Sequence, residues 1–306
     1  MHTLILGCGF SGTRIARELA VEGRVSGTRR DGAVLEGLRR QGVEAFALDG
    51  GVSEALLERL ATVTHLISSV APSRELPLDD PMLPLFGPLV AAGALPRLAW
   101  IGYLSTIGVY GDHAGEWIDE GTPCRSRQQR SIARLEAEGA WRTLGDAAGV
   151  PIALLRLSGI YGPGRNAVRD ALLGRARVLT GHGQVFNRIH VDDLARAVAL
   201  SAKGRVGGIL NVTDDTPSAP EDVVRYAHTL LGLEPPPAIA FDEAELSPMA
   251  RSFYGERKRV SNARSKDALG LRYAYPSYRT GLEALLPHEL EQVSTGREGD
   301  DAHPSV

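Results

Sequence analysis

Three glycines near the start of the chain have the spacing of a phosphate-binding turn. Gly7, Gly9 and Gly12 directly follow an apolar run, and apolar residues at helical spacing come after them. In the order strand, G-x-G-x-x-G turn, helix, the first glycine makes a tight turn, the second lets the backbone approach a pyrophosphate, and the third lets helix and strand pack closely. The pattern predicts a dinucleotide site with Phe10 and Ser11 beside the phosphates; a turn that only connects strand and helix is the alternative.

Two arginines stand where the ribose of the nucleotide is expected. An NAD site usually has an acid about twenty residues past the glycines, whereas Arg29 and Arg30 follow the second expected strand here. Guanidinium groups bind phosphate oxygens in a bidentate manner, so this pair suits a 2′-phosphate and favours NADP. NAD stays possible because Asp31 follows, and a solvated basic turn is the other interpretation.

The elements that must position these groups alternate between strand and helix along the chain. Further strands are expected at 43–48, 64–70, 97–104, 152–157 and 208–212, with helices at 53–60, capped by Ser53, and at 126–143. This alternation predicts an α/β fold, a doubly wound parallel sheet of the Rossmann type. Ligands of such sheets bind at the carboxyl ends of the strands, which places Asp49, Ser69 and Ala71 at the cofactor site.

Bulk composition excludes several classes of function. The formal net charge of -3, without a basic patch interleaved with aromatic residues, gives no reason to expect nucleic acid as a partner. No apolar run approaches the roughly 20 residues that span a bilayer, and the chain leads directly into its first strand, so no membrane association and a cytoplasmic location are expected. The two cysteines, Cys8 and Cys124, support neither a disulfide framework nor a zinc site. A small-molecule substrate is favoured.

A series of motifs downstream of the glycine turn resembles the extended short-chain dehydrogenases/reductases, which include nucleotide-sugar epimerases and dehydratases. These motifs are residues 105–111 (STIGVYG), 160–165 (IYGPGR), 188–194 (RIHVDDL), 259–262 (RVSN) and 269–271 (LGL). The resemblance covers roughly residues 1–285 and is strongest to the atypical branch. It implies a Rossmann domain, a small C-terminal substrate-binding domain, and a homodimer formed through the helix that contains Arg130.

The resemblance divides the chain into two units and a tail. Residues 1–158, together with 186–213, are expected to form the NAD(P)-binding domain, and residues 159–185 and 214–288 the substrate side. Residues 289–306 are rich in Ser, Thr, Gly, Asp, His and Pro, and we expect them to be a disordered tail.

The chain departs from the family at the proton relay. The family's Tyr-x-x-x-Lys pair has Arg130 and Arg134 at the corresponding positions of the expected helix. Arginine has only donors and a pKa above about 12, so Arg130 cannot act as a general acid or base near neutral pH. The pair could instead form an anion clamp, or be two solvated arginines paired with Glu136 and Glu138.

Other candidates for catalysis come from the matched motifs. Thr106 matches the family's catalytic Ser/Thr, whose hydroxyl can bind a substrate oxygen; a strand-end threonine that satisfies local backbone is the alternative. The missing proton is expected to come from water, from the substrate, or from Tyr110 or Tyr161 as a substitute donor. Arg165 and Asn166 are expected as substrate contacts. The His-Val-Asp-Asp run at 190–193 is interpreted as a helix N-cap rather than a metal site, so no metal is expected.

Three functions follow from these features. The leading hypothesis is an NADP-binding oxidoreductase or epimerase/dehydratase-like enzyme that acts on a small polar or anionic substrate without the usual proton relay. The alternative is a catalytically inactive NADP-sensing or partner-binding protein, because the acid-base pair is replaced. A third reading is a non-redox isomerase or lyase in which the cofactor is only structural.

Overall fold

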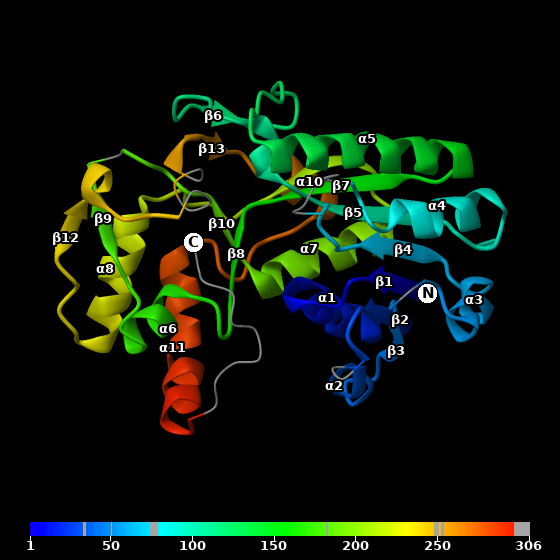
Figure 1. The fold of residues 1–306 in the computed structure, drawn as a ribbon, viewed down its shortest axis with the longest axis horizontal. Helices are drawn as coiled ribbons and strands as arrows, with labels where there is room; N and C mark the ends of the chain where they lie inside the picture. Colours follow the sequence, from blue (N-terminus) through cyan, green and yellow to red (C-terminus); the bar gives the residue numbers. More distant parts are fainter. Residues whose placement is uncertain are drawn as a thin grey trace.

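A parallel β-sheet forms the centre of the molecule in a computed structural model, which describes residues 1–32, 35–49, 51–73, 79–181, 183–247, 251 and 254–296. The described residues form a seven-stranded sheet in the order β11-β7-β5-β4-β1-β2-β3, and every neighbouring pair is parallel (Figure 1). Its strands are β1 (His2–Leu6), β2 (Arg24–Arg29), β3 (Glu44–Ala47), β4 (His65–Ser68), β5 (Trp100–Thr106), β7 (Ile152–Leu157) and β11 (Gly208–Val212). The predicted α/β fold with a Rossmann-type sheet is confirmed.

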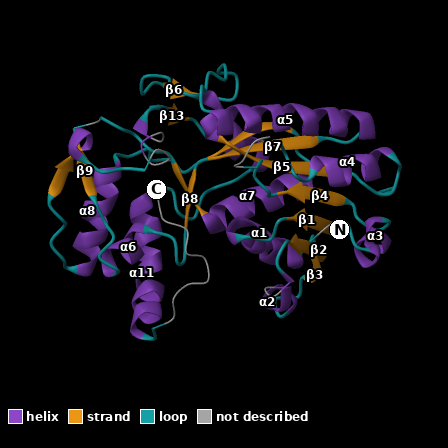
Figure 2. Ribbon diagram, viewed as in Figure 1, coloured by secondary structure: helices purple, strands orange, loops and turns teal. Residues whose placement is uncertain are grey.

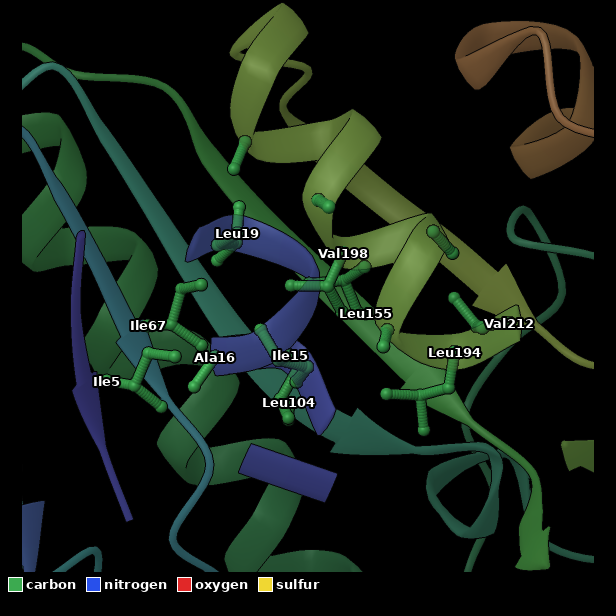
Figure 3. Close-up of a cluster of buried hydrophobic side chains, with 14 of the residues drawn as sticks. Ile5, Ile15, Ala16, Leu19, Ile67, Leu104, Leu155, Leu194, Val198 and Val212 are labelled. Atoms are coloured by element: carbon green, nitrogen blue, oxygen red, sulfur yellow. The ribbon is translucent and has the colours of Figure 1, made fainter. Parts of the chain in front are cut away.

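Helices cover both faces of this sheet (Figure 2). One face carries α1 (Phe10–Ala20), α2 (Leu35–Arg39) and α7 (Val191–Gly204), and the other carries α3 (Glu54–Leu60), α4 (Leu83–Ala91) and α5 (Gln129–Ala148). In the first layer Ile15 and Leu19 of α1 meet Val198 of α7 above the sheet residues Ile5 and Leu155 (Figure 3). Because both faces are covered, β1 and β7 are buried along their whole length, as expected of strands in a doubly wound sheet.

The edges and ends of these elements are capped by polar groups. Ser53 accepts a hydrogen bond from the Leu56 N–H at the start of α3, as the sequence predicts. At the outer edge strand β11, the Asn211 N–H donates to Glu120 and the Asn211 carbonyl accepts from Ser265. The side chains of Glu120 and Ser265 thus form hydrogen bonds with backbone groups that an edge strand would otherwise leave unpaired.

A second group of elements lies beside the carboxyl ends of the strands, at the left of Figure 1. It contains three short parallel pairs, β8 (Gly159–Tyr161) with β10 (Arg188–His190), β9 (Val178–Thr180) with β12 (Ala238–Ala240), and β6 (Trp117–Ile118) with β13 (Arg259–Val260). The helices of this group are α6 (Ala167–Leu172), α8 (Pro220–Leu231) and α11 (Tyr278–Ser294), with the short 3-10 helix η3 (Phe241–Glu243). Helix α10 (Ala263–Leu269) instead packs against α7 and β11 of the central sheet, and the short 3-10 helix η2 (Ile107–Tyr110) lies against α5. Helices α6, α8 and α11 share their own apolar cluster, separate from the two clusters that cover the sheet.

The disordered tail that was expected to begin at residue 289 overlaps the end of a helix. Helix α11 continues to Ser294, and Glu289, the first residue of the expected tail, is fully buried. Residues 297–306 lie outside the described part of the chain. Within the described ranges, no helix is both long enough and apolar enough to cross a membrane.

Candidate functional site

The glycine turn between β1 and α1 has the shape that a pyrophosphate requires. Gly7 has a φ of +91°, and a Cβ atom built on Gly12 would overlap with the carbonyl oxygen of Gly7. By contrast, a Cβ atom on Gly9 would have no neighbour within 4 Å. The backbone at Gly9 is therefore open to a ligand, whereas Gly7 and Gly12 are required by the fold.

The N-terminus of α1 meets this open turn. Gly9 is the N-cap residue and has no side-chain capping bond, and the first turn of α1 contains no acid. Helix N-termini attract anions through their free N–H groups and the positive end of the helix dipole. The backbone N–H groups of Phe10 and Ser11 belong to this uncapped first turn, which fits the phosphates of a dinucleotide.

The end of β2 is tied to the same turn. Thr28 accepts from the Gly7 N–H through its hydroxyl (3.1 Å), and its carbonyl accepts from the Cys8 N–H (2.8 Å). Arg29 donates from Nη1 to the Cys8 carbonyl at 3.0 Å, so its guanidinium lies beside the turn, while Arg30 is exposed. Both arginines thus lie at the carboxyl end of β2, and Arg29 lies beside the glycine turn.

The remaining expected cofactor residues follow neighbouring strands. Asp49 is exposed just after β3, and Ser69 donates from its N–H to the Leu6 carbonyl (2.9 Å), which continues the pairing of β4 with β1. Ala71 is exposed two residues later. All three lie at the carboxyl edge of the sheet, where ligands of this fold bind.

Thr106 ends β5 and begins η2. Its hydroxyl accepts a hydrogen bond from the Gly108 N–H at 3.1 Å, which is the local backbone role that the sequence left open. A hydroxyl that accepts one bond can still donate its own proton to a substrate oxygen. Ser131 of α5 is close by, because a Cβ atom on Gly108 would lie 3.1 Å from its Oγ.

Arg130 and Arg134 of α5 have different surroundings. Arg134 donates from Nη1 to the Leu104 carbonyl at 2.6 Å, and its guanidinium carbon lies 5.8 Å from the ring centre of Tyr103. Arg130 is in the first turn of α5 and is exposed. The structure therefore brings Arg134 to the end of β5, near Thr106, and leaves Arg130 at the surface of the helix.

A buried ion pair lies behind Thr106 and corrects one expected pairing. Glu138 does not pair with the α5 arginines; it accepts from Nε and Nη2 of Arg156 at 3.0 and 2.7 Å. Ser105 donates to the same carboxylate at 2.5 Å. This pair links α5, β5 and β7 directly beneath the candidate site.

Both tyrosines expected as proton donors are packing residues. Tyr110 is fully buried, and its hydroxyl donates to Asn211 Oδ1 at 2.8 Å. The Tyr161 hydroxyl reaches the Ser277 carbonyl at 3.4 Å, and its ring fills the space over Gly281 in α11. Burial raises the pKa of both hydroxyls, and each hydroxyl already donates its proton within the protein, which is a structural role rather than the expected one of a substitute acid.

The substrate contacts expected in the Tyr-Gly-Pro-Gly-Arg-Asn loop also need correction. Asn166 is buried, its Oδ1 caps α6 by accepting from the Arg169 N–H, and its Nδ2 donates to Glu289 Oε1 at 2.7 Å. These bonds make Asn166 a structural residue. Arg165 is half-buried, with its guanidinium carbon 5.8 Å from the ring centre of Phe10, so it faces the glycine turn.

The His-Val-Asp-Asp motif is a helix N-cap, as predicted. His190 Nδ1 accepts from the Asp192 N–H at 3.2 Å, and burial lowers the pKa of His190 to about 4. Asp193 accepts from the backbone N–H groups of Ala274 and Tyr275, at 2.9 and 2.7 Å. Among the described residues, no three His, Cys, Asp or Glu side chains are placed to hold a metal ion.

Sequence reasoning missed the charged groups that hold the site together. Glu289 lies inside the expected tail, and its partners are more than 100 residues away in the sequence. Arg156 could have been recognised in the sequence, because a charged residue inside the apolar run 152–157 needs a partner of opposite charge when the strand is buried. The identity of that partner, Glu138, required the fold.

Comparison with known proteins identifies related sequences. A sequence model described as the NAD dependent epimerase/dehydratase family matches residues 3–213. Protein YeeZ of Escherichia coli (strain K12) is 30% identical over 284 residues, which cover 89% of this chain and 95% of that protein. A 3-diazoavenalumate denitrifying reductase of Streptomyces sp is 31% identical over 186 residues, 57% of this chain and 58% of that protein.

Solved structures show the same architecture. A functionally unknown conserved protein from Silicibacter pomeroyi DSS has a TM-score of 0.84 and 43% identity, covering 94% of this chain and 98% of its own. A UDP-glucuronic acid 4-epimerase from Bacillus cereus, in complex with NAD, has a TM-score of 0.74 at 15% identity, covering 95% and 99%. At that identity the second similarity concerns the fold alone.

Proposed function

Because the chain belongs to the NAD dependent epimerase/dehydratase family, we propose that it is an NADP-binding oxidoreductase or epimerase-like enzyme acting on a small polar or anionic substrate. The observation that carries this proposal is the open backbone at Gly9, in front of an α1 N-terminus that lacks both a side-chain cap and an acid. A turn that served only to connect β1 to α1 would have no need of that space.

The preference for NADP is supported by the end of β2. Arg29 is fixed beside the turn by its bond to the Cys8 carbonyl, and Arg30 follows it at the surface. Two guanidinium groups favour a phosphate ester over a ribose hydroxyl, which an acid would bind better. The matching family is described as NAD dependent, so the preference for NADP over NAD is proposed from these two arginines alone.

The groups at the end of β5 are the candidates for substrate binding. A bound nicotinamide dinucleotide supplies or accepts a hydride. Thr106 would donate its hydroxyl proton to a substrate oxygen, and Arg134 would stabilise negative charge that develops nearby. Since residues 130 and 134 are both arginine and the two nearby tyrosines are buried, we infer that the proton comes from water or from the substrate itself.

A binding assay and an activity assay together test the proposal. NADPH at one hundred times its Kd should raise the free energy of unfolding by about 2.7 kcal/mol, measured by denaturation with and without ligand. NADPH should then be oxidised in the presence of at least one member of a panel of carbonyl compounds and nucleotide sugars. Failure of NADPH and NADH to bind would overturn the proposal.

A second candidate is a cofactor-sensing protein that binds NADP without turning it over. The burial of Tyr110 and Tyr161 favours it, because neither hydroxyl is available to move a proton. The double variant Arg130→Tyr, Arg134→Lys distinguishes the two candidates. If hydride transfer is seen only in this variant, the natural chain is a sensor; if the natural chain already transfers hydride, it is an enzyme.

A further inference from the structure

Arg188 of β10 lies beside the chain segment that leaves β7. It pairs with Gly159 in the β8–β10 pair, and Gly159 is two residues beyond Leu157, which pairs with Thr106 of β5. Ligands of this fold bind at the carboxyl ends of the strands. Arg188 is therefore at the same edge of the sheet as the candidate site.

The guanidinium of Arg188 lies in a recess and has no acidic partner. The residue is partly exposed, yet burial lowers the pKa of Arg188, so solvent reaches a guanidinium that the protein largely surrounds. Nη1 donates to the Ser218 hydroxyl at 2.7 Å and to the carbonyls of Phe186 and Ser218 at 3.2 and 3.3 Å. Among the residues that the structure describes, no carboxylate oxygen is within 4.0 Å of its nitrogens, and Nε and Nη2 form no hydrogen bond. The charge of this arginine is thus left without a counter-ion.

A buried carboxyl lies next to Arg188. The Asp214 N–H donates to the Arg188 carbonyl at 2.7 Å, and Asp214 Oδ1 accepts from the Thr216 N–H at 3.1 Å. Asp214 Oδ2 is buried and has no hydrogen-bond partner within the described part of the chain. Because burial raises the pKa of Asp214 to about 8, this carboxyl is largely neutral at pH 7, and Oδ2 can carry its proton. A neutral carboxyl supplies an O–H donor and does not offset the charge of Arg188.

We propose that Arg188 and Asp214 bind the carboxylate of an aromatic or apolar acid, an assignment of the substrate class that rests on the proposed function. A carboxylate is planar and accepts two parallel N–H bonds from one guanidinium, here from Nε and Nη2. Its remaining lone pairs accept the O–H of Asp214. A single guanidinium carries one positive charge, which matches a carboxylate better than a doubly charged phosphate.

Aromatic rings beside the guanidinium suit the rest of such an acid. The Arg188 guanidinium carbon lies 5.7 Å from the ring centre of Phe186, and the Phe186 and Tyr254 rings meet edge to face at 5.3 Å. Phe186 is partly exposed. Sites for small molecules are lined mainly by apolar and aromatic side chains around a few polar groups. The polar pair and the rings next to it have this composition.

Titration of the chain with three probes at pH 7 tests this assignment by ligand-observed NMR. Benzoate carries the carboxylate, benzamide has nearly the same shape without the charge, and phenyl phosphate carries the larger anion. Benzoate should bind at least tenfold more tightly than benzamide and more tightly than phenyl phosphate. Arg188→Met should weaken benzoate binding at least tenfold, consistent with loss of a charge-assisted hydrogen bond, and leave benzamide within about twofold. Arg188→Lys should recover part of the loss.

Matched variants separate charge from structure. Arg225→Met removes an exposed arginine of α8 and should leave all three affinities unchanged. Asp214→Leu, which removes the donor, should weaken benzoate binding about fivefold, whereas Asp214→Asn keeps a donor and should stay within about twofold of the wild type. Should Arg188→Met lower the unfolding temperature, Arg188→Gln gives the same comparison with a side chain that keeps a donor for Ser218.

Several results would overturn the inference. These are benzoate binding no stronger than benzamide binding, benzoate binding unchanged in Arg188→Met, or phenyl phosphate binding more tightly than benzoate. The titrations contain no dinucleotide, so NADPH binding by the same protein tests the proposed function separately. A chain that binds benzoate through Arg188 but no dinucleotide would keep the carboxylate site and lose the proposed function.

Discussion

Glu138 and Arg156 form a two-bond ion pair that is almost completely buried between α5 and β7. Ser105, the residue before Thr106, donates to the same carboxylate, so the pair sets the position of the β5 end relative to α5. The positions of Thr106 and Arg134 thus depend on a buried ion pair between neighbouring elements.

Removing one member of this pair should destabilise the protein strongly. Glu138→Ala leaves the Arg156 charge buried without its partner, for which the expected loss in free energy of unfolding is about 3–5 kcal/mol. The double variant Glu138→Leu, Arg156→Met, which buries no charge, should lose clearly less. Urea denaturation measures both. A loss below about 1 kcal/mol in the single variant would show that the pair contributes little.

Two glycines of the same turn should respond in opposite ways to alanine. Gly12→Ala forces a methyl group onto the Gly7 carbonyl and should lower the free energy of unfolding by roughly 1–3 kcal/mol. Gly9→Ala has room for its methyl group and a φ of -79° that alanine accepts, so its unfolding temperature should stay near that of the wild type. Its NADPH affinity should nevertheless fall at least tenfold, because the methyl group occupies the space left for the phosphates. Unchanged NADPH binding by folded Gly9→Ala would argue against a pyrophosphate at this turn.

The choice between NADP and NAD should depend on the end of β2. The double variant Arg29→Ala, Arg30→Ala is expected to raise the Kd for NADPH at least tenfold and to change the Kd for NADH by less than about twofold. Arg40→Ala, which removes another exposed arginine, is the matched control. An equal loss of both nucleotides would mean that these arginines stabilise the turn without selecting the 2′-phosphate.

Stability should fall with rising pH because of Asp214, a buried carboxyl just after β11. Burial raises the pKa of Asp214 to about 8, from an ordinary value of 3.8, and the nearby Asp215 and Asp193 act in the same direction while Arg188 opposes them. Between about pH 4 and pH 8 the folded state therefore holds a proton that the unfolded state has lost, so its contribution to stability decreases as pH rises.

Asp214→Asn, which stays neutral, tests this pH dependence. Its free energy of unfolding relative to the wild type should improve by at least about 1.4 kcal/mol between pH 5 and pH 8, the value of a change of one in pKa. The control is Asp267→Asn, at an exposed residue of α10 that does not act on the pKa of Asp214. Parallel pH profiles for wild type and Asp214→Asn would contradict the raised pKa.

The local sequence was sufficient to predict the strands of the central sheet and the position of the glycine turn. Largely apolar runs of four to eight residues, alternating with helical periodicity, predicted every strand of the central sheet, with ends that differ from the observed ones by a few residues. The same applies to the Ser53 and His190 caps, because a capping side chain acts on N–H groups two or three residues away. These features are encoded over short distances and can be read along the chain.

Only the tertiary structure decided what the polar side chains around the site do. Asn166 and Glu289 are 123 residues apart in sequence, and Tyr110 and Asn211 are 101 apart, yet each pair is joined by a buried hydrogen bond. A motif specifies a residue type, but its role depends on which partner the packing brings within hydrogen-bonding distance once water is excluded. The sequence by itself therefore determined the fold and the location of the glycine turn. The tertiary structure showed that Tyr110, Tyr161 and Asn166 form hydrogen bonds within the protein, and that Glu289 holds Gly164 and Asn166 in place.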